Sequence, residues 1–393
     1  MLLKKVQAGR KFRKLAGVLC AAALAGSLSA CGGGAAGASS AAPASSEAVS
    51  GSQAAPASSA AGAEGQASAS SGAATAQGQA GGSAEGKPIQ IVTAMFPEYD
   101  WTREILGDHA GNAEITLLMD NGTDLHSFQP TAEDMMRIAS CDLFIYTGGP
   151  SAQWAEKALK TAVNPDMVVL DLMDALGDRV KEEEIVEGMQ HEHDHEHEGE
   201  DHDHEAEDHD HEAGEADEHV WLSLKNASFL CGEIEKALAE ADPANAAIYE
   251  TNLAAYQAKL DALDKEYQAA VDAAAVKTLL FGDRFPFRYL VDDYGLSYYA
   301  AFSGCSAETE ASFETITFLA NKADEIPVSC VMTIDGSDGR IAETIARSTK
   351  SKDQKILTLN SMQSVTEKQV KDGVTYLSVM EENLNVLKEA LGE

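Results

Sequence analysis

The stretch PANAAIYETNLAAYQAKLDALDKEYQAAVDAA, residues 243–274, decides the architecture of this chain. After its first residue it contains no proline and no glycine, and apolar side chains recur at helical spacing at Ile248, Leu253, Tyr256, Leu260, Leu263 and Tyr267. The pattern predicts one helix of about 45 Å, at a rise of 1.5 Å per residue. A helix of this length divides the chain into a part before it and a part after it.

Short apolar runs alternate with segments of helical spacing on both sides of this helix. Such alternation is typical of parallel α/β layers. The predicted fold class is therefore α/β, with two βα lobes built on parallel sheets, joined by one long rigid helix and separated by a ligand cleft. The expected strands lie in residues 88–96, 113–119, 142–149, 167–173, 277–283, 296–302, 328–334 and 355–360. The expected later helices lie in residues 287–295, 312–326, 339–350 and 366–391.

The first 86 residues do not have the composition of a folded domain. Six basic residues and an apolar run ending at Ala30 are typical of a secretory signal peptide in residues 1–30. The sequence LSAC ending at Cys31 resembles the bacterial lipobox, which predicts cleavage before Cys31 and acylation of its thiol. Residues 31–86 are nearly all Ala, Ser, Gly and Gln, so we expect a disordered tether.

The rest of the chain divides into three predicted parts. An N-terminal metal-binding lobe covers residues 87–242, the interlobe helix covers residues 243–275, and a C-terminal lobe covers residues 276–393. A histidine-rich loop at residues 189–218 interrupts the N-terminal lobe. Four cysteines follow the lipid site, namely Cys141, Cys231, Cys305 and Cys330, and no CxxC pair is present. The sequence is compatible both with disulfides between them and with free buried thiols.

The charge of the chain excludes one class of partner. The net charge is −35, and removal of the six basic residues of the leader takes it to −41. Nucleic-acid binding needs the opposite sign, so no nucleic-acid partner is expected. A strongly acidic protein is soluble and attracts cations.

Histidine alternates with acidic residues in the run HEHDHEHEGEDHDHEAEDHDHE, residues 191–212. The pattern suits neither a helix nor a strand, so this loop either is a solvated charged segment or collects divalent ions weakly and at several stoichiometries. It cannot supply a single defined geometry, and we expect an accessory role. Its histidines are His191, His193, His195, His197, His202, His204, His209 and His211.

Two further histidines stand in different surroundings. His126 lies in a turn-rich loop after the second expected strand, where parallel sheets place their ligands. His219 lies where the acidic run gives way to the apolar residues Val220 to Leu222, at the edge of the expected core. Neutral imidazole binds Zn²⁺ and related ions, so a site of histidines works at pH 7 and weakens in acid.

Four blocks together resemble the zinc and manganese substrate-binding lipoproteins of bacterial ABC transporters. They are GTDLHSFQP (122–130), DEHVWLSLKNA (217–227), YLVDDYGL (289–296) and CSAETEAS (305–312), and their order and the position of the histidine-rich run match that family. The resemblance implies two βα lobes, one metal in the cleft between them and delivery to a membrane permease.

The same resemblance implies the metal ligands. His126 and His219 match the two first-lobe histidines of the family. The third family position falls in FGDRFPFRYLVDDYGL (281–296), which has no histidine; Asp283 fits with one residue inserted, whereas ungapped matching places Arg284 there. The fourth falls at or near Asn360 and Gln363, and we take Asn360 as the expected ligand.

The sequence thus predicts a monomeric zinc-capture protein, anchored by lipid at the outer face of a bacterial cell membrane, that serves an ABC importer permease. It is not expected to be an enzyme, because it carries no HExxH or other local catalytic motif. Zn²⁺ is the expected ligand, with Mn²⁺ as an alternative, because two histidines with a carboxylate and water suit both ions. A surface adhesin or a metal-storage protein that acts through the histidine-rich loop is the other alternative.

Overall fold

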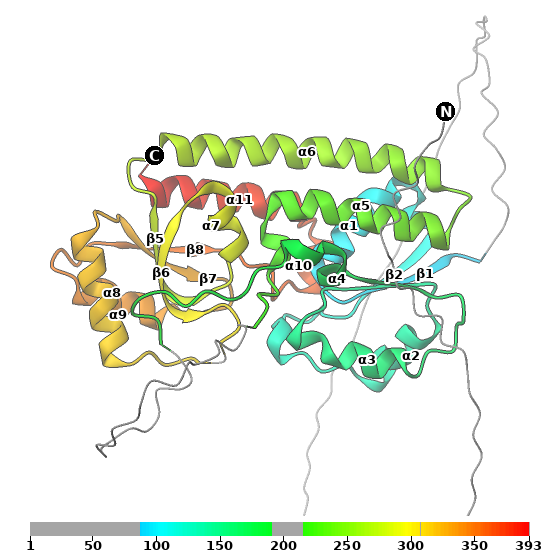
Figure 1. Ribbon diagram of the computed structural model, residues 1–393, viewed down its shortest axis with the longest axis horizontal. Helices are drawn as coiled ribbons and strands as arrows, with labels where there is room; N and C mark the ends of the chain where they lie inside the picture. Colours follow the sequence, from blue (N-terminus) through cyan, green and yellow to red (C-terminus); the bar gives the residue numbers. More distant parts are fainter. Residues whose placement is uncertain (1–86, 191–214, 307, 393) are drawn as a thin grey trace, which may run out of the picture. The chain divides into compact units, whose positions relative to one another are not determined.

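The computed structural model describes residues 87–190, 215–306 and 308–392, and within them two four-stranded sheets carry the fold (Figure 1). All strand pairs are parallel, and the two sheets have equivalent orders, β2-β1-β3-β4 and β6-β5-β7-β8. The strands of the first sheet are β1 (Ile89–Thr93), β2 (Ala113–Leu117), β3 (Leu143–Tyr146) and β4 (Val168–Asp171). Those of the second are β5 (Thr278–Phe285), β6 (Ser297–Ser303), β7 (Cys330–Ile334) and β8 (Lys355–Leu359).

The helices follow the strands as a parallel sheet requires. In the first lobe they are α1 (Phe96–Leu106), α2 (Ala132–Ser140), α3 (Gln153–Leu159), α4 (Leu172–Leu176) and α5 (Leu224–Ala241). After α6 (Ala246–Ala273) the second lobe has α7 (Arg288–Tyr294), α8 (Phe313–Glu325), α9 (Arg340–Ser348), α10 (Glu367–Lys371) and α11 (Tyr376–Leu391). Two of the short 3-10 helices, Leu125–Ser127 and Val220–Leu222, flank the candidate site. The predicted two-lobed α/β fold is confirmed.

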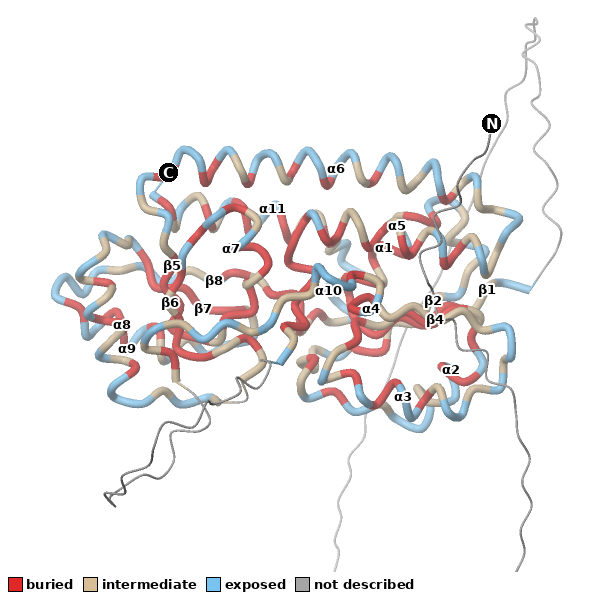
Figure 2. The backbone as a smooth tube through the Cα atoms, in the orientation of Figure 1, coloured by how far each residue is buried: buried red, intermediate tan, exposed pale blue. Residues whose placement is uncertain are grey.

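Helix α6 joins the lobes because one of its faces is apolar along its whole length. The residues buried on that face include Tyr249, Tyr256, Leu260 and Tyr267. The helix packs against α1 and α5 of the first lobe and against α7 and α11 of the second. Figure 2 shows this pattern, in which buried positions recur along one side of α6 while the outer side is exposed. A hydrogen bond from the Tyr267 hydroxyl to the Met380 carbonyl, 2.6 Å long, fixes its C-terminal half on α11.

A second segment crosses from the first lobe to the second and is held there by hydrogen bonds. The segment 180–190 leaves the first lobe after α4 and lies on the second sheet, as Figure 1 shows. Lys181 N donates to the Tyr289 hydroxyl, and Gln190 N donates to the Ala301 carbonyl beside β6. We call residues 180–190 the strap. The strap and α6 together restrain the lobes, which favours local rearrangement over a wide hinge motion.

At the C-terminus the structure differs from the helices and lobes that the sequence predicts. The pattern in residues 366–391 predicts one helix, but the structure has α10 and α11 with a break at Gly373, whose φ of 95° is left-handed. Moreover α11 does not belong to the second lobe alone, because Tyr376 N donates to the buried carboxylate of Asp100 on α1 at 2.8 Å. The start of α11 thus contacts the first lobe, and the helix runs from there along the second lobe to the C-terminus (Figure 1).

Several predicted features lie outside the described residues. These are the signal peptide and tether in residues 1–86, with the lipid site Cys31, and the eight histidines from His191 to His211. Across the part of the chain that is described, no helix combines the length and the apolar character needed to cross a lipid bilayer. The four cysteines in that part are free thiols, and three of them are buried.

Candidate metal site

His126 lies on the loop that follows β2, within the short helix Leu125–Ser127. Asp124 begins that helix, and its Oδ1 accepts a hydrogen bond from His126 N at 3.0 Å. The imidazole Nδ1 lies 2.8 Å from Ser151 Oγ and 3.5 Å from a carboxylate oxygen of Glu218. Both acceptors favour a proton on Nδ1, which leaves the lone pair of Nε2 free to bind an ion.

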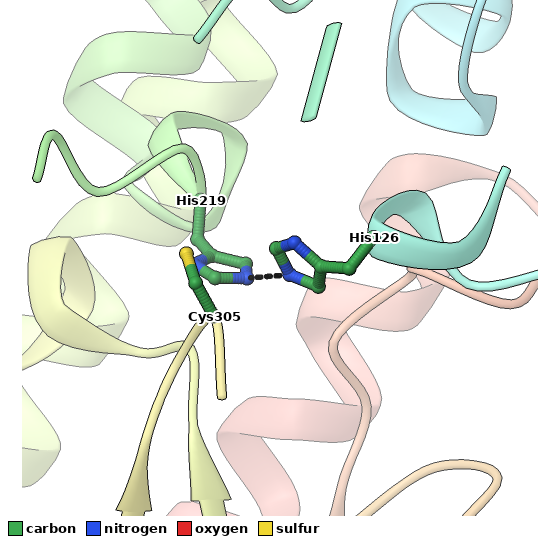
Figure 3. A group of neighbouring side chains, drawn as sticks. All are labelled: His126, His219 and Cys305. Atoms are coloured by element: carbon green, nitrogen blue, oxygen red, sulfur yellow. Dashed lines mark hydrogen bonds between the residues drawn. The ribbon is translucent and has the colours of Figure 1, made fainter. Parts of the chain in front are cut away.

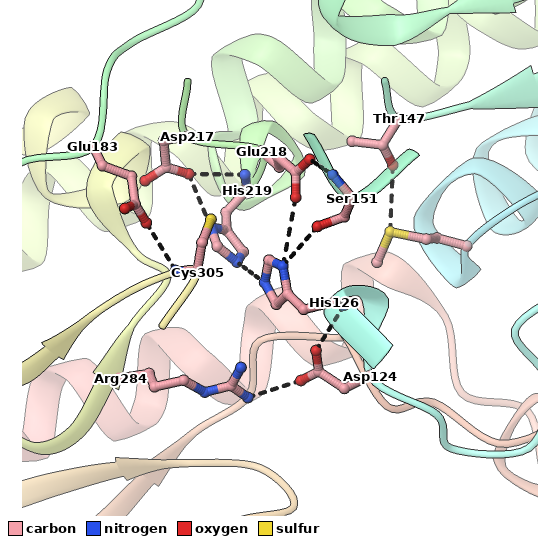
Figure 4. Close-up of polar contacts among 11 residues, drawn as sticks. Asp124, His126, Thr147, Ser151, Glu183, Asp217, Glu218, His219, Arg284 and Cys305 are labelled. Carbon is pink, nitrogen blue, oxygen red and sulfur yellow. Dashed lines mark hydrogen bonds and ion pairs between the residues drawn. The ribbon is translucent and has the colours of Figure 1, made fainter. Parts of the chain in front are cut away.

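His219 is fully buried and directly precedes the helix Val220–Leu222. Asp217 fixes its ring, because one carboxylate oxygen accepts from His219 N at 2.8 Å and lies 2.9 Å from Nδ1 (Figure 4). The edge of the ring also contacts Trp221, with a centroid distance of 5.4 Å. The carboxylate holds the proton on Nδ1, so Nε2 of His219 is also left as a free donor atom.

The two histidines converge although 93 residues separate them. Their Nε2 atoms lie 3.4 Å apart and their ring centroids 5.4 Å apart. A third side chain joins them, since one ligand atom each of His126, His219 and Cys305 lies within 4.8 Å of the other two (Figure 3). The structure thus places the two expected histidines side by side and adds a thiol that the sequence interpretation did not include.

Cys305 follows β6, at the carboxyl edge of the second sheet, where parallel sheets place ligands. Its N–H donates to Glu183 of the strap at 2.8 Å. The preceding Gly304 permits the close approach, because a Cβ there would lie 2.9 Å from His219 Cε1. A larger residue at Gly304 would therefore displace the imidazole.

At neutral pH the charge state of His126 favours metal binding, whereas that of Cys305 requires the loss of a proton. Burial, together with the nearby charges of His219 and Arg284, lowers the pKa of His126 to about 4. Burial raises the pKa of the Cys305 thiol well above its usual range, and nearby acidic residues add to the rise. The ion-free site therefore contains a neutral imidazole at His126 and a protonated thiol at Cys305.

The other expected ligands lie outside the three-residue group. Asp283 is buried, and its carboxylate accepts from Thr333 Oγ1 at 2.5 Å and from Arg284 N at 2.9 Å. Asn360 forms a turn, since its Oδ1 accepts from Met362 N at 2.8 Å. The group contains Cys305 and not Asp283, whose carboxylate is bonded to Thr333 and to Arg284 N of its own lobe.

Arg284 also lies close to the histidines but cannot bind a cation. Its guanidinium donates to Asp124 of the first lobe at 2.7 Å and so links the two lobes beside His126. Gln363 has a different character, because it is 3% exposed and neither its amide nitrogen nor its amide oxygen has a hydrogen-bond partner. A buried amide without partners costs free energy, and here it lines the same cleft as His126.

That cleft has a volume of about 940 Å³ and is open to solvent on one side. Acidic side chains outnumber basic ones in its wall, which includes Asp124, Asp283, Glu308, Glu310, Asp335 and Asp338. A cleft with acidic walls concentrates cations near its inner end. His126 forms part of this wall, so an ion in the cleft has a path to the two histidines.

A family model described as zinc-uptake complex component A, periplasmic (ZnuA), matches residues 91–390. The chain belongs to this family. The resemblance inferred from the four sequence blocks is thereby confirmed. Within the family, the chain is 33% identical over 306 residues to the zinc-binding lipoprotein AdcA of Streptococcus pneumoniae serotype 4, a match that covers 78% of this chain and 56% of the relative. It therefore spans a little over half the length of the curated AdcA proteins.

Two other relatives match over nearly their full length. The high-affinity zinc uptake system protein ZnuA of Bacillus subtilis is 29% identical over 312 residues, which cover 79% of this chain and 90% of the relative. The crystal structure of the Zn(II)-bound ZnuA-like domain of S. pneumoniae AdcA matches with a TM-score of 0.59 and 28% identity. That match covers 78% of this chain and 99% of the domain. The family is thus one of zinc-uptake components.

The sequence gives weaker signals for two candidate site residues, Cys305 and Gln363, than for the histidines. Cys305 stands in CSAETEAS, one of the blocks that carries the resemblance, yet it has no neighbouring ligand in the sequence. Its position directly after an expected strand is the signal that could have identified it. Gln363 lies next to Met362, which has a left-handed φ of 61° while being buried. No pattern in the sequence predicts that conformation.

Proposed function

We propose that this protein captures one Zn²⁺ ion outside the cell, between His126 and His219, and delivers it to the permease of an ABC importer. The observation that carries the proposal is the convergence of two Nε2 atoms 3.4 Å apart, one on the partly buried ring of His126 and one on the buried ring of His219, each ring with a polar oxygen at Nδ1. Donors arranged in this way need no reorganisation of the rings when an ion arrives. The binding of an ion, rather than catalysis, is the proposed activity.

The location and partners of the protein belong to the same proposal. The lipobox at Cys31 would anchor the chain at the outer face of the membrane, and residues 31–86 would let the lobes reach a permease as a monomer. The names of the B. subtilis and S. pneumoniae relatives, a zinc uptake protein and a zinc-binding lipoprotein, support this role. The histidines from His191 to His211 would act as an accessory that raises the local zinc concentration.

Growth in zinc-depleted medium tests the proposed function. Cells that lack the gene receive either the wild-type gene or the variant that combines His126→Ala with His219→Ala. We expect the wild type to restore growth and zinc content and the variant to fail at equal protein level, because both free donor atoms are lost. His109→Ala serves as the control, since this histidine lies outside the group of ligand atoms.

The outcomes separate the alternatives. Restoration of manganese content instead of zinc content would support the manganese alternative. Full restoration by the double variant would refute the proposal, and loss of restoration only when the eight histidines of residues 191–211 are replaced would support metal storage or adhesion through that segment.

A further inference from the structure

Cys305 offers a type of metal ligand that the histidines do not. We propose that its thiolate is the third ligand of the bound ion and that it makes the site select thiophilic divalent cations, Zn²⁺ and Cd²⁺, over Mn²⁺. This inference rests on the proposed function and assigns both a ligand and a substrate class to the same site. Three observations support it: the distances among the donor atoms, the contacts beside Cys305, and the contacts that three nearby carboxylates already make.

The distances fit a four-coordinate ion. Zinc binds nitrogen at about 2.0–2.1 Å and thiolate sulfur at about 2.3 Å, so the donors of a tetrahedral site lie about 3.3–3.7 Å apart. The two Nε2 atoms are 3.4 Å apart, and the group that includes the sulfur spans at most 4.8 Å. A shift of the Cys305 side chain by about 1 Å would complete three corners of the tetrahedron, and the fourth corner stays open for water.

The thiol is held beside the histidines by two independent contacts. Glu183 of the strap accepts the N–H of Cys305, and Gly304 lets the loop approach the His219 ring closely. Among the four cysteines that the structure describes, Cys305 alone is partly exposed, whereas Cys141, Cys231 and Cys330 are buried. Cys305 is therefore the least buried of these four thiols and the one that lies beside the histidines.

Three carboxylates near the site are already engaged in other contacts, which leaves fewer of the oxygen ligands that manganese prefers. Asp217 binds the ring of His219, Asp124 binds Arg284, and Asp283 binds Thr333. Mn²⁺ favours carboxylate, carbonyl and water ligands in octahedral geometry, whereas thiolate with imidazole favours zinc. Two nitrogens and one sulfur form a set that discriminates between the two ions.

The exchange of ligands balances in atoms and charge. The Cys305 thiol and M²⁺ give a thiolate-bound M⁺ unit and one free H⁺, with no oxidant or reductant involved. The resulting charge of +1 on the site, with two neutral imidazoles, lies against the acidic wall of the cleft.

Cobalt(II) substitution tests the inference, because a cobalt–thiolate bond produces a charge-transfer band in the near ultraviolet and cobalt–imidazole bonds do not. We expect the purified, reduced protein to show this band and Cys305→Ser to lose it, while Cys330→Ser retains it. Binding of cobalt by the histidines of residues 191–211 gives no such band, so it does not interfere. In competition titrations Cys305→Ser should bind Zn²⁺ at least about 100-fold more weakly, since even outer partners of ligands contribute 10- to 100-fold.

The affinity for Mn²⁺ should not fall in Cys305→Ser. The ratio of zinc affinity to manganese affinity should therefore be smaller in this variant than in the wild type. Cys305→His gives a second variant in case serine impairs folding: it should keep tight zinc binding but lose the band. If the wild type has no band, or if Cys305→Ser binds zinc as the wild type does while His126→Ala abolishes binding, the inference is overturned and the proposed function stands. If neither histidine affects tight zinc binding, the proposed function fails with it.

Discussion

The contact between Asp217 and His219 allows one prediction to be worked through in detail. We predict that Asp217→Asn weakens zinc binding without loss of the fold. Asp217 is 2% exposed, and one of its oxygens accepts from His219 N while also facing Nδ1. The asparagine amide can preserve the hydrogen bonds but not the negative charge that stabilises the ring when an ion binds Nε2.

The expected loss of zinc affinity follows from the position of Asp217, whose carboxylate contacts the proposed ligand His219 and not the ion itself. Loss of such an outer partner costs about 10- to 100-fold in metal affinity, or about 1.4 to 2.7 kcal/mol. We expect Asp217→Asn near the lower end and Asp217→Ala near the upper end, because alanine also leaves the buried donors of His219 without an acceptor. The assay is competition with a zinc chelator at pH 7, in protein whose histidines from His191 to His211 are replaced by alanine.

Asp100→Asn is the matched control. Its carboxylate is 3% exposed and accepts from Tyr376 N at 2.8 Å, and it has no contact with the histidines. This variant should keep the zinc affinity of the wild type, because it changes a buried carboxylate to an amide in the same way but away from the histidines. Wild-type zinc affinity in Asp217→Asn and in Asp217→Ala, with unfolding temperatures near that of the wild type, would refute the view that this carboxylate orients and polarises His219.

Three further predictions concern the surroundings of the site and the core. Gly304→Ala should weaken zinc binding at least about tenfold in the same titration, because the added Cβ would lie 2.9 Å from His219 Cε1. An unchanged zinc affinity would show that the loop can move away from the ring. Arg284→Gln should strengthen zinc binding about fivefold at low salt, because the substitution removes a repulsion of about 1 kcal/mol between the guanidinium and the ion. An increase in affinity that does not shrink at high salt would contradict this electrostatic reason. Burial raises the pKa of Glu98 to about 8, so its contribution to folding is present below pH 4.5 and is lost as the pH rises through 8; denaturant unfolding should therefore show a stability loss on the order of 4 kcal/mol between pH 5 and pH 9, which Glu98→Gln should abolish.

Local patterns in the sequence were sufficient to predict the fold. The unbroken helical spacing from Ile248 to Tyr267 identified α6, and the alternation of apolar runs identified both parallel sheets. The break at Gly373 was missed because the residues on both sides of it have helical spacing, and only the structure shows that Tyr376, at the start of α11, bonds to Asp100 of α1. Packing over long sequence separations overrides local propensity in such places.

The site was partly predictable for a related reason. His126 and His219 carry signals in their own blocks, but their approach to 3.4 Å is a property of the topology, which brings the ends of distant segments together. Cys305 comes from the other lobe and has no local motif, so only the folded structure reveals it as a neighbour. Asp283 was favoured by matching to the family, whereas the hydrogen bond to Thr333 that turns it away depends on β7.

The most direct test of a single defined site between the lobes is a zinc titration by calorimetry in three forms of the protein. The first is the wild type, the second has the eight histidines from His191 to His211 replaced by alanine, and the third adds His126→Ala and His219→Ala to the second. We predict one tight zinc ion per chain in the first two forms, with additional weak sites only in the wild type, and no tight site in the third. Weak, multiple binding in the wild type that disappears in the second form would contradict a zinc site at His126 and His219.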